Sequence, residues 1–253
     1  MKFKDLLNTI NVAHKNIGCS KPYICGGIPR DKYMNKLSNI DDLDITTGDN
    51  TIHNLSIETF RLLKNNFNVQ NKYYDDGHSS IFLGNLKIDF SSNFKIPNIE
   101  NILIKKNILN PTNIEKEFFS RDFTCNALVL DTNLKNIIDI TKNGFKDIDA
   151  KVIKTCLDPE ISLLSKQKRV IRSVYLASKL DFNIDNKIVK FVSNNINLIQ
   201  ADHSNNLIKK LDIAFNINPD KASWYLSAMK LWDKVKITDT IYPYYMRRRN
   251  AKK

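Results

Sequence analysis

The sequence predicts an α+β protein, with a mixed β-sheet and flanking helices in its first part and helices alone in its second part. Three observations predict this division. Short apolar runs alternate with amphipathic stretches up to about residue 154, strand patterns then cease, and four amphipathic stretches follow. We therefore expect a head domain over residues 1–154 and an all-helical module with a basic C-terminal tail over residues 155–253.

The head is expected to begin with a helix and a strand. Apolar residues recur at helical spacing over residues 3–17, and Gly18 marks the end of this helix. The apolar run at residues 23–25 precedes Gly26 and Gly27, which predicts a buried strand that ends in a turn. Further along, we expect a short helix over residues 31–37, a strand over residues 42–46 and a helix over residues 51–67.

A hairpin and a long loop are expected next. Gly84 and Asn85 separate the apolar runs at residues 80–83 and 86–90, a pattern typical of a β-hairpin. Residues 91–115 show weak periodicity, so we expect a long loop, which in a compact domain is either functional or mobile. The head then ends with two strands and the turn between them, at residues 129–130, Asn133 and residues 137–140.

The second part of the chain shows helical periodicity throughout, without strand signals. The expected helices cover residues 161–180, 186–199, 205–217 and 219–231. The basic tail at residues 246–253 is expected to be a frayed terminus, which can still contact phosphates while disordered.

The composition favours a polyanionic partner. Hydrophobic residues make up 42% of the 253 residues, which is enough for a core, and 39 Lys and Arg against 27 Asp and Glu give a net charge of +12. Nucleic acid is the common partner of such a protein. A lysine-rich surface from an AT-rich genome explains the excess equally well, so charge alone does not decide between the two.

Cysteine and histidine usage argues against zinc and disulfides. The 4 cysteines form no CxxC pair, and the 4 histidines show no zinc-ligand spacing. No apolar segment has the pattern of a secretion signal or the length of a membrane span. We therefore expect a cytoplasmic protein without a membrane partner.

The most informative residues are two aspartates on one predicted strand. Asp42 and Asp44 are two positions apart, so their side chains point to the same face of the strand. Neighbouring carboxylates repel unless a cation lies between them, and with Mg²⁺ they form a clamp suited to phosphoryl and nucleotidyl transfer. Upstream, Gly26 and Gly27 let a backbone approach a phosphate, and Arg30 can neutralise its charge.

Taken singly, each of these motifs is common in proteins with other roles, but their order and spacing are specific. Over roughly residues 20–180 the chain resembles the class II tRNA nucleotidyltransferase and bacterial poly(A) polymerase family, of the DNA polymerase beta superfamily. The resemblance implies a nucleotidyltransferase head followed by a helical neck and body. Its segments are GGIPRD, DLDITT, SRDFTCNAL, IIDITKNGFKDI and DPEISLLSKQKRVIR.

The resemblance implies roles for individual residues. Asp42 and Asp44 match metal-binding aspartates, and Asp89 is the candidate for a third catalytic acid. Ser120 replaces the first arginine of the family's RRDFTxNAL motif, and Gly144 is expected to supply backbone freedom at a hinge. The nucleotide-binding residues that the resemblance implies are Gly26, Gly27, Arg30, Arg121, Asp122, Asn126, Lys166, Arg169 and Arg172.

The chain departs from the family at the residues that read the base. Relatives carry EDxxR, whereas Ser165 and Lys166 stand here in place of the Glu-Asp pair. The family's Asp accepts a hydrogen bond from the exocyclic amine of cytosine or adenine, and an ammonium group only donates. The selection of C and A over U and G is therefore open.

The basic residues near this departure have two interpretations. On one continuous helix, Lys166, Arg169 and Arg172 would share a face at positions i, i+3 and i+6. That face is either solvated or a site for nucleotide or RNA phosphates. The family match favours the phosphate site for Arg169 and Arg172, and Lys166 is undecided.

The implied function is a template-independent RNA nucleotidyltransferase. It would use ATP and CTP with two Mg²⁺ ions to add CCA, or part of it, to the 3′ end of tRNA. Alternatives are a poly(A)-polymerase-like enzyme on other RNA, a catalytically silent RNA-binding relative, and a small-molecule nucleotidyltransferase. The retained aspartates argue against the silent relative, and the basic excess argues against the small-molecule enzyme. About a hundred residues follow the head, so we expect either a homodimer or a partner protein to complete the binding of tRNA, or a shorter RNA as the substrate.

Overall fold

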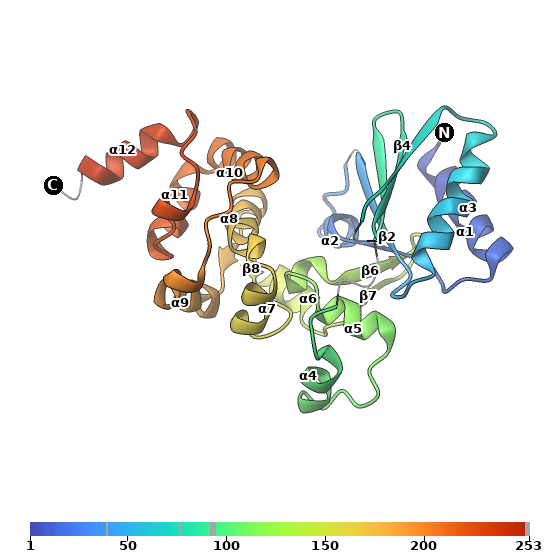
Figure 1. The fold of residues 1–253 in the computed structure, drawn as a ribbon, viewed down its shortest axis with the longest axis horizontal. Helices are drawn as coiled ribbons and strands as arrows, with labels where there is room; N and C mark the ends of the chain where they lie inside the picture. Colours follow the sequence, from blue (N-terminus) through green and yellow to red (C-terminus); the bar gives the residue numbers. More distant parts are fainter. Residues whose placement is uncertain (39, 76, 92–94, 251–253) are drawn as a thin grey trace. The chain divides into compact units, whose positions relative to one another are not determined.

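A computed structural model describes residues 1–38, 40–75, 77–91 and 95–250. The chain divides into two compact units, Met1–Phe145 and Lys146–Lys253, and each is a separate body (Figure 1). The boundary that we expect at residues 154 and 155 is drawn from where strand patterns cease, which is a different criterion, and it stays a prediction. The α+β class, with a mixed sheet followed by helices, is confirmed.

The first unit is built on a seven-stranded sheet in the order β3-β4-β5-β2-β1-β6-β7. Strands β2 and β5 run parallel, while the neighbouring pair β4 and β5 forms the expected antiparallel hairpin. The strands are β1 (Tyr23–Cys25), β2 (Asp42–Thr46), β3 (Val69–Tyr73), β4 (Ser79–Leu83), β5 (Leu86–Phe90), β6 (Leu128–Asp131) and β7 (Ile137–Asp139).

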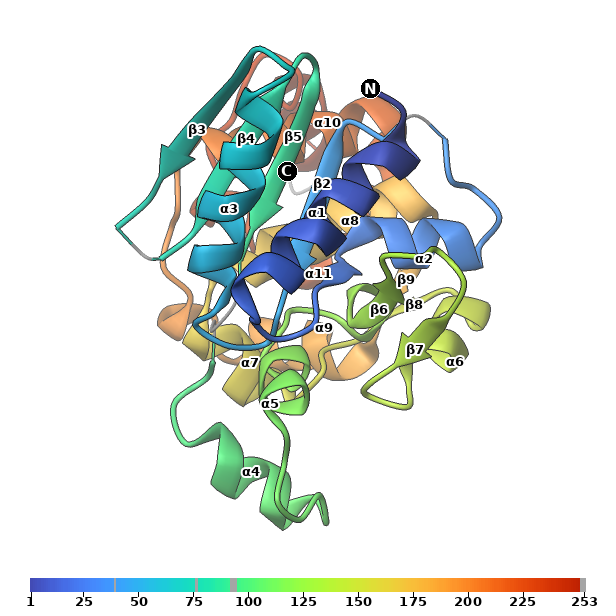
Figure 2. The same cartoon turned by 90° about the vertical axis from the view of Figure 1, so that its right-hand side faces the viewer.

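Two helices, α1 (Phe3–Ile17) and α3 (Ile52–Lys64), pack side by side over one face of this sheet (Figure 2). Their apolar sides form the core together with buried strand residues, among them Leu43 and Ile45 of β2. Because side chains alternate along a strand, Asp42 and Asp44 lie on the other face. The core therefore fixes which face of β2 presents the acidic side chains.

Two expectations about the head are wrong in detail, and one strand was not expected. The short helix, α2, covers Gly27–Tyr33 and so begins directly at the glycine turn. The expected loop at residues 91–115 contains α4 (Ile99–Lys105) and the start of α5 (Asn113–Phe119), which begins with a capping box between Thr112 and Glu115. Strand β3 was not expected, because it is an edge strand with exposed polar side chains and no apolar alternation.

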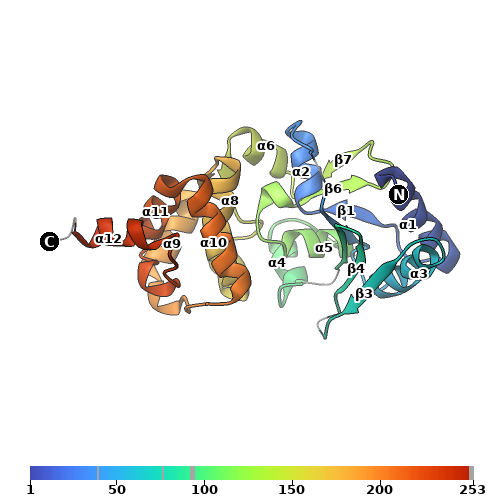
Figure 3. The ribbon, with the colours of Figure 1, turned by 90° about the horizontal axis from the view of Figure 1, so that it is seen from above.

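The second unit is mainly helical, and α8, α10 and α11 pack against one another (Figure 3). Strands β8 (Val152–Ile153) and β9 (Asn183–Ile184) also pair in parallel, which corrects the expectation of helices alone. Helix α6 (Gly144–Asp149) spans the division between the units. The other helices are α7 (Pro159–Ser165), α8 (Lys168–Leu180), α9 (Asn186–Asn194), α10 (Asn205–Ile217), α11 (Pro219–Ala228) and α12 (Tyr242–Asn250).

Helix α12 replaces most of the frayed terminus that the basic tail predicts. It extends as far as Asn250, and residues 251–253 lie outside the described part of the chain. In the described ranges, no helix combines the length and the apolar character that crossing a bilayer requires.

Candidate active site

Three carboxylates come together on the face of the sheet opposite the α1 and α3 core. Asp42 and Asp44 of β2 and Asp89 of β5 each place one oxygen within 4.8 Å of the others. The parallel register of β2 and β5 sets Asp44 directly opposite Asp89. The expectation that both β2 aspartates share a face is confirmed, and the structure places Asp89, the candidate for the third acid, beside them.

The cluster holds negative charge at an energetic cost. The pKa of Asp44 is raised to about 6, first by burial and then by the charge of Asp42, while Arg121 acts in the opposite direction. A divalent cation would remove the repulsion, and an all-oxygen donor set of this kind suits a hard ion such as Mg²⁺. The three carboxylates therefore fit a metal site by their chemistry as well as by their spacing.

Asp89 is held in place by two neighbours on the sheet. Ser80 Oγ of β4 donates to Asp89 Oδ1 at 2.5 Å, and Lys87 Nζ of β5 donates to Asp89 Oδ2 at 2.5 Å. Ser80 is buried, whereas the side chain of Lys87 is 38% exposed. These bonds fix the rotamer of Asp89 and partly neutralise it.

The glycine turn contacts the same cluster. Gly26 has φ of +75°, in the left-handed region that side chains disfavour, and a Cβ atom there would overlap Oδ2 of Asp44. At Gly27, a Cβ atom would lie 3.3 Å from Nη2 of Arg30. Only glycine therefore allows the backbone to pass this close to the Asp44 carboxylate.

Arg30 lies in a buried network that joins α2 to the turn η1 (Thr124–Asn126). Its exposure is 3%, its Nε donates to Asp31 Oδ1 at 2.8 Å, and its Nη1 donates to Asn126 Oδ1 at 2.5 Å. Asn126 Nδ2 in turn lies 3.5 Å from Asp122 Oδ1. The structure thus brings Arg30, Asp122 and Asn126 together, and their contact with nucleotide stays a prediction.

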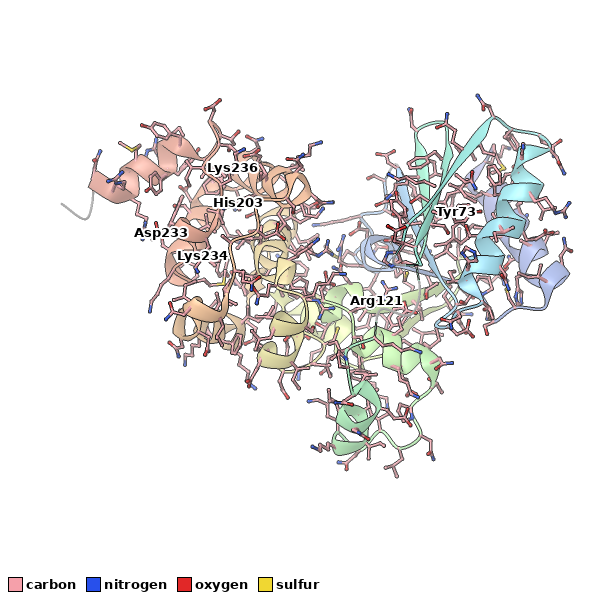
Figure 4. All side chains as sticks on the ribbon, in the orientation of Figure 1. Tyr73, Arg121, His203, Asp233, Lys234 and Lys236 are labelled. Atoms are coloured by element: carbon pink, nitrogen blue, oxygen red, sulfur yellow. The ribbon has the colours of Figure 1, made fainter. Side chains whose placement is uncertain are left out.

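Arg121, which is labelled in Figure 4, is held by a carboxylate that the sequence analysis missed. Its Nη2 donates to Glu117 Oε1 at 2.6 Å and lies 3.1 Å from Cys25 Sγ. Glu117 is 2% exposed, and its second oxygen accepts from Thr46 Oγ1 at 2.6 Å. The i, i+4 spacing of Glu117 and Arg121 was the available signal. Glu117 therefore fixes the guanidinium behind the acidic cluster.

Cys25, beside Arg121, is not a nucleophile in this arrangement. Burial raises the pKa of its thiol to about 12, and the nearby Arg121 charge only partly offsets this. Since the thiolate is the reactive form, the thiol is inert near neutral pH.

The segment that is predicted to read the base, in the second unit, differs from the expected single helix. Helix α7 ends at Ser165, and Lys166 has extended backbone angles, φ −155° and ψ 88°, before α8 begins at Lys168. The expectation that Lys166 shares one helix face with Arg169 and Arg172 is therefore wrong, because the helix does not continue through it.

Arg169 and Arg172 do lie three positions apart on α8, but Arg169 is 3% exposed. Its Nη1 donates to the carbonyl and the hydroxyl oxygen of Ser162, both at 3.0 Å. Arg169 thus ties α8 to α7. The nucleotide contacts of Lys166, Arg169 and Arg172 stay predictions.

Gly144 has a different role from the one expected. Its φ is outside the left-handed region, so the residue needs no special backbone freedom. A Cβ atom would lie 2.7 Å from Leu128 Cδ2 and 2.8 Å from the Thr124 carbonyl oxygen. Glycine is required here by close packing.

The poly(A) polymerase head domain, as a family model, matches residues 22–154, which is more than half of the chain. The chain belongs to this family. The match covers every residue of the acidic cluster and the glycine turn, and the resemblance to class II tRNA nucleotidyltransferases is confirmed.

Curated relatives of this head-domain protein include two tRNA nucleotidyltransferases. The tRNA nucleotidyltransferase cca2 of Schizosaccharomyces pombe is 28% identical over 67% of this chain and 37% of its own length. The A-adding tRNA nucleotidyltransferase of Aquifex aeolicus is 25% identical over 87% of this chain and 26% of its own length. The chain thus spans well under half the length of either relative.

Solved structures share the fold. A tRNA nucleotidyltransferase complexed with a primer tRNA and an incoming ATP analog has a TM-score of 0.58 and 23% identity, over 88% of this chain and 60% of that one. A CCA-adding enzyme with CTP has a TM-score of 0.66 and 22% identity, over 94% of this chain and 54% of that one. At this identity the likeness establishes the fold.

Proposed function

We propose that this head-domain protein is a template-independent RNA nucleotidyltransferase that adds nucleotides to the 3′ end of tRNA. The observation that carries the proposal is the convergence of Asp42, Asp44 and Asp89 within 4.8 Å, beside a glycine whose backbone contacts Asp44. The relatives named as tRNA nucleotidyltransferases, and the solved complex with a primer tRNA and an ATP analog, support this substrate pair.

The reaction is an in-line displacement at phosphorus. The oxygen of the terminal 3′-hydroxyl forms a bond to the α-phosphorus, the bond from that phosphorus to the bridging oxygen breaks, pyrophosphate departs, and the hydroxyl proton passes to water. Asp42, Asp44 and Asp89 would hold Mg²⁺, which when bound stabilises the charge on the attacking and leaving oxygens.

The protein groups around the cluster position these parts. Ser80 and Lys87 fix Asp89, and Gly26 lets the backbone of the turn pass against the Asp44 carboxylate, where we propose that nucleotide phosphates bind. We propose that Arg30 and Arg121 add positive charge beside the triphosphate from positions set by Asn126 and Glu117. Catalysis then rests on positioning and charge stabilisation, without a covalent protein intermediate.

The product is part of the proposal. We propose CCA, or part of it, from CTP and ATP, with poly(A)-like addition to other RNA as the second candidate, because the family model covers poly(A) polymerase heads. Lys166, Arg169 and Arg172 are the proposed base-proximal residues. We further propose a cytoplasmic location. We also propose that a homodimer or a partner protein supplies the remaining contacts to the RNA.

One experiment tests the proposal. Purified protein is incubated with Mg²⁺, each single labelled nucleoside triphosphate, and a panel of tRNAs lacking their 3′ ends plus an unstructured RNA. Addition of nucleotides from CTP or ATP to tRNA supports the proposal, and the added length distinguishes CCA, C, A and oligo(A) products. A folded protein that extends none of these RNAs contradicts it.

A further inference from the structure

A row of side chains leads from the acidic cluster to the exposed edge of the head sheet. Strand register places Asp44 opposite Asp89, Asp89 opposite Ser80, and Ser80 opposite Lys72, on β2, β5, β4 and β3 in turn. Residues directly opposite one another in a sheet project from the same face. Lys72 therefore lies on the same face as the carboxylates, two strands beyond Asp89.

Tyr74 connects this edge to the cluster. It follows Lys72 by two positions, its backbone N–H continues the hairpin by donating to the carbonyl oxygen of His78, and its hydroxyl lies 3.4 Å from Ser80 Oγ. Ser80 is the residue that donates to Asp89. The Lys72 ammonium lies 4.9 Å from the centre of the Tyr74 ring, and Tyr74 is 37% exposed. We call Lys72, Tyr74 and Ser80 the edge strip.

The neighbouring residue, Tyr73, lies on the opposite face of the head sheet. The ring of Tyr73 lies 5.6 Å from the ring of His53 on α3, so it points to the helix-covered face (Figure 4). Because side chains alternate along β3, Lys72 and Tyr74 point the other way. Tyr73 and Tyr74 are thus adjacent in sequence, both exposed, and on opposite faces.

The chemistry of the edge strip suits a nucleic-acid strand. An exposed aromatic ring offers a stacking surface to a base, and an ammonium group beside it can pair with a phosphate. Lys72 belongs to a chain of net charge +12, whose excess favours a polyanion.

The geometry of the reaction decides which substrate the edge strip meets. In an in-line displacement, the attacking hydroxyl and the departing pyrophosphate lie on opposite sides of the α-phosphorus. Gly26 contacts Asp44 from the β1 side of β2, and the edge strip lies on the β5 side. With nucleotide phosphates at Gly26, the hydroxyl of the primer arrives from the edge-strip side.

We propose that the edge strip binds the 3′-terminal strand of the RNA primer, with Tyr74 stacked on a base and Lys72 on a phosphate. The inference rests on the proposed function, because the reaction supplies the direction from which the primer approaches. It makes Tyr74 and Lys72 positioning residues for the primer and leaves them no role in holding the nucleoside triphosphate.

The test compares two edge-strip variants with two control variants. Tyr74→Ala and Lys72→Ala are compared with Tyr73→Ala, on the opposite face of β3, and with Lys64→Ala, at the exposed end of α3. We expect the first pair to raise the KM for primer RNA about tenfold, while the KM for nucleotide changes less than about twofold. The control pair should leave both values unchanged, and Tyr74→Phe, which keeps the ring, should behave like the wild type.

Direct binding gives a second readout that needs no activity. Fluorescence anisotropy with a labelled primer RNA at increasing salt should show weaker binding for Tyr74→Ala and Lys72→Ala. For Lys72→Ala, the slope of log K against log salt should become less steep, by about the amount that one phosphate contact contributes.

The outcomes separate this inference from the proposed function. If the wild type extends RNA and Tyr74→Ala leaves primer KM and binding unchanged, the edge strip is not a primer site. A rise in nucleotide KM alone also overturns the inference, because the strip would then hold the triphosphate. If the wild type extends no RNA, the proposed function fails. The binding measurement then still tests the edge strip, because weaker RNA binding by the two variants supports it as an RNA site and unchanged binding contradicts it.

Discussion

Asp44 and Asp89 face each other across the parallel strands β2 and β5, and Asp42 completes a cluster in which each residue offers an oxygen within 4.8 Å of the others. Leu43 and Ile45, which alternate with the β2 aspartates, are fully buried in the core. The same strand thus secures the fold with one face and concentrates negative charge on the other.

Removal of either β2 carboxylate should abolish nucleotide addition. Asp42→Asn and Asp44→Asn each take away a metal ligand without changing side-chain size, so we expect at least about a 100-fold loss of incorporation. Incorporation of a labelled nucleotide into RNA at saturating Mg²⁺ measures this. Asp41→Asn, an exposed neighbour, is the matched control and should keep activity near the wild-type level. Near-normal incorporation by Asp44→Asn would rule out the metal assignment.

The stability of the metal-free protein should depend on the charge of Asp44. Its pKa is about 6 in the folded protein against an ordinary value of 3.8, so the carboxyl is protonated in both states below about pH 3. As the pH rises from about 4 to 6, the unfolded chain ionises first, and the free energy of unfolding falls by up to about 3 kcal/mol. Asp44→Asn should therefore stabilise the protein above pH 6 and have little effect at pH 4.

Urea unfolding in EDTA at several pH values between 4 and 8 measures this difference. Asp41→Asn serves again as the control. An equal effect of Asp44→Asn at pH 4 and pH 8 would contradict the assigned pKa.

Divalent cations should stabilise the wild type. Binding to the folded state alone adds about 2.7 kcal/mol at a concentration of 100 times Kd. The melting temperature should rise on addition of Mg²⁺ or Mn²⁺ at pH 7.5, and it should rise less at pH 5, where Asp44 is largely protonated in the absence of metal. Asp44→Asn should lose most of the effect. A similar rise in Asp44→Asn would show that the ions bind elsewhere.

Loss of Glu117 should destabilise the head through Arg121. Glu117→Gln takes a buried carboxylate, 3% exposed, away from a guanidinium whose side chain is 19% exposed, which costs about 2–5 kcal/mol. Glu117→Gln combined with Arg121→Met should cost less than the sum of the single changes, which chemical denaturation and a double-mutant cycle can measure. The pair Lys116 and Glu100, whose carboxylate is 57% exposed, is the control, since Glu100→Gln should cost no more than about 1 kcal/mol. Additive costs in the cycle would contradict a direct Glu117–Arg121 coupling.

Gly26→Ala should impair the site beyond the effect of backbone strain. The added Cβ atom would overlap the Asp44 carboxylate, so we expect loss of metal-dependent stabilisation as well as of activity. Gly18→Ala provides the comparison, because Gly18 also has a positive φ, +61°, but a Cβ atom added there would meet no other atom within 4 Å. Its cost should be limited to about 1 kcal/mol of strain and leave the metal response intact. Equal metal responses in the two variants would contradict the contact.

Local patterns predicted much of the head. The amphipathic period placed α1 at Phe3–Ile17, the alternation of acidic and apolar residues placed β2 at Asp42–Thr46, and Gly84-Asn85 placed the β4–β5 hairpin. These features depend on neighbours in sequence, which the period of a helix or a strand records directly. The capping box at Thr112 was also present in the sequence and would have revealed α5.

The sequence by itself determined that two carboxylates share a face of β2, because strand geometry fixes this within a few residues. Only the tertiary structure decided that Asp89 stands opposite Asp44, that Glu117 joins Arg121 to Thr46 of β2, and that Lys166 lies outside the helix of Arg169. The first two depend on strand pairing and side-chain packing between segments far apart along the chain or on different elements. The third depends on where two helices separate, which the spacing of charged residues does not encode.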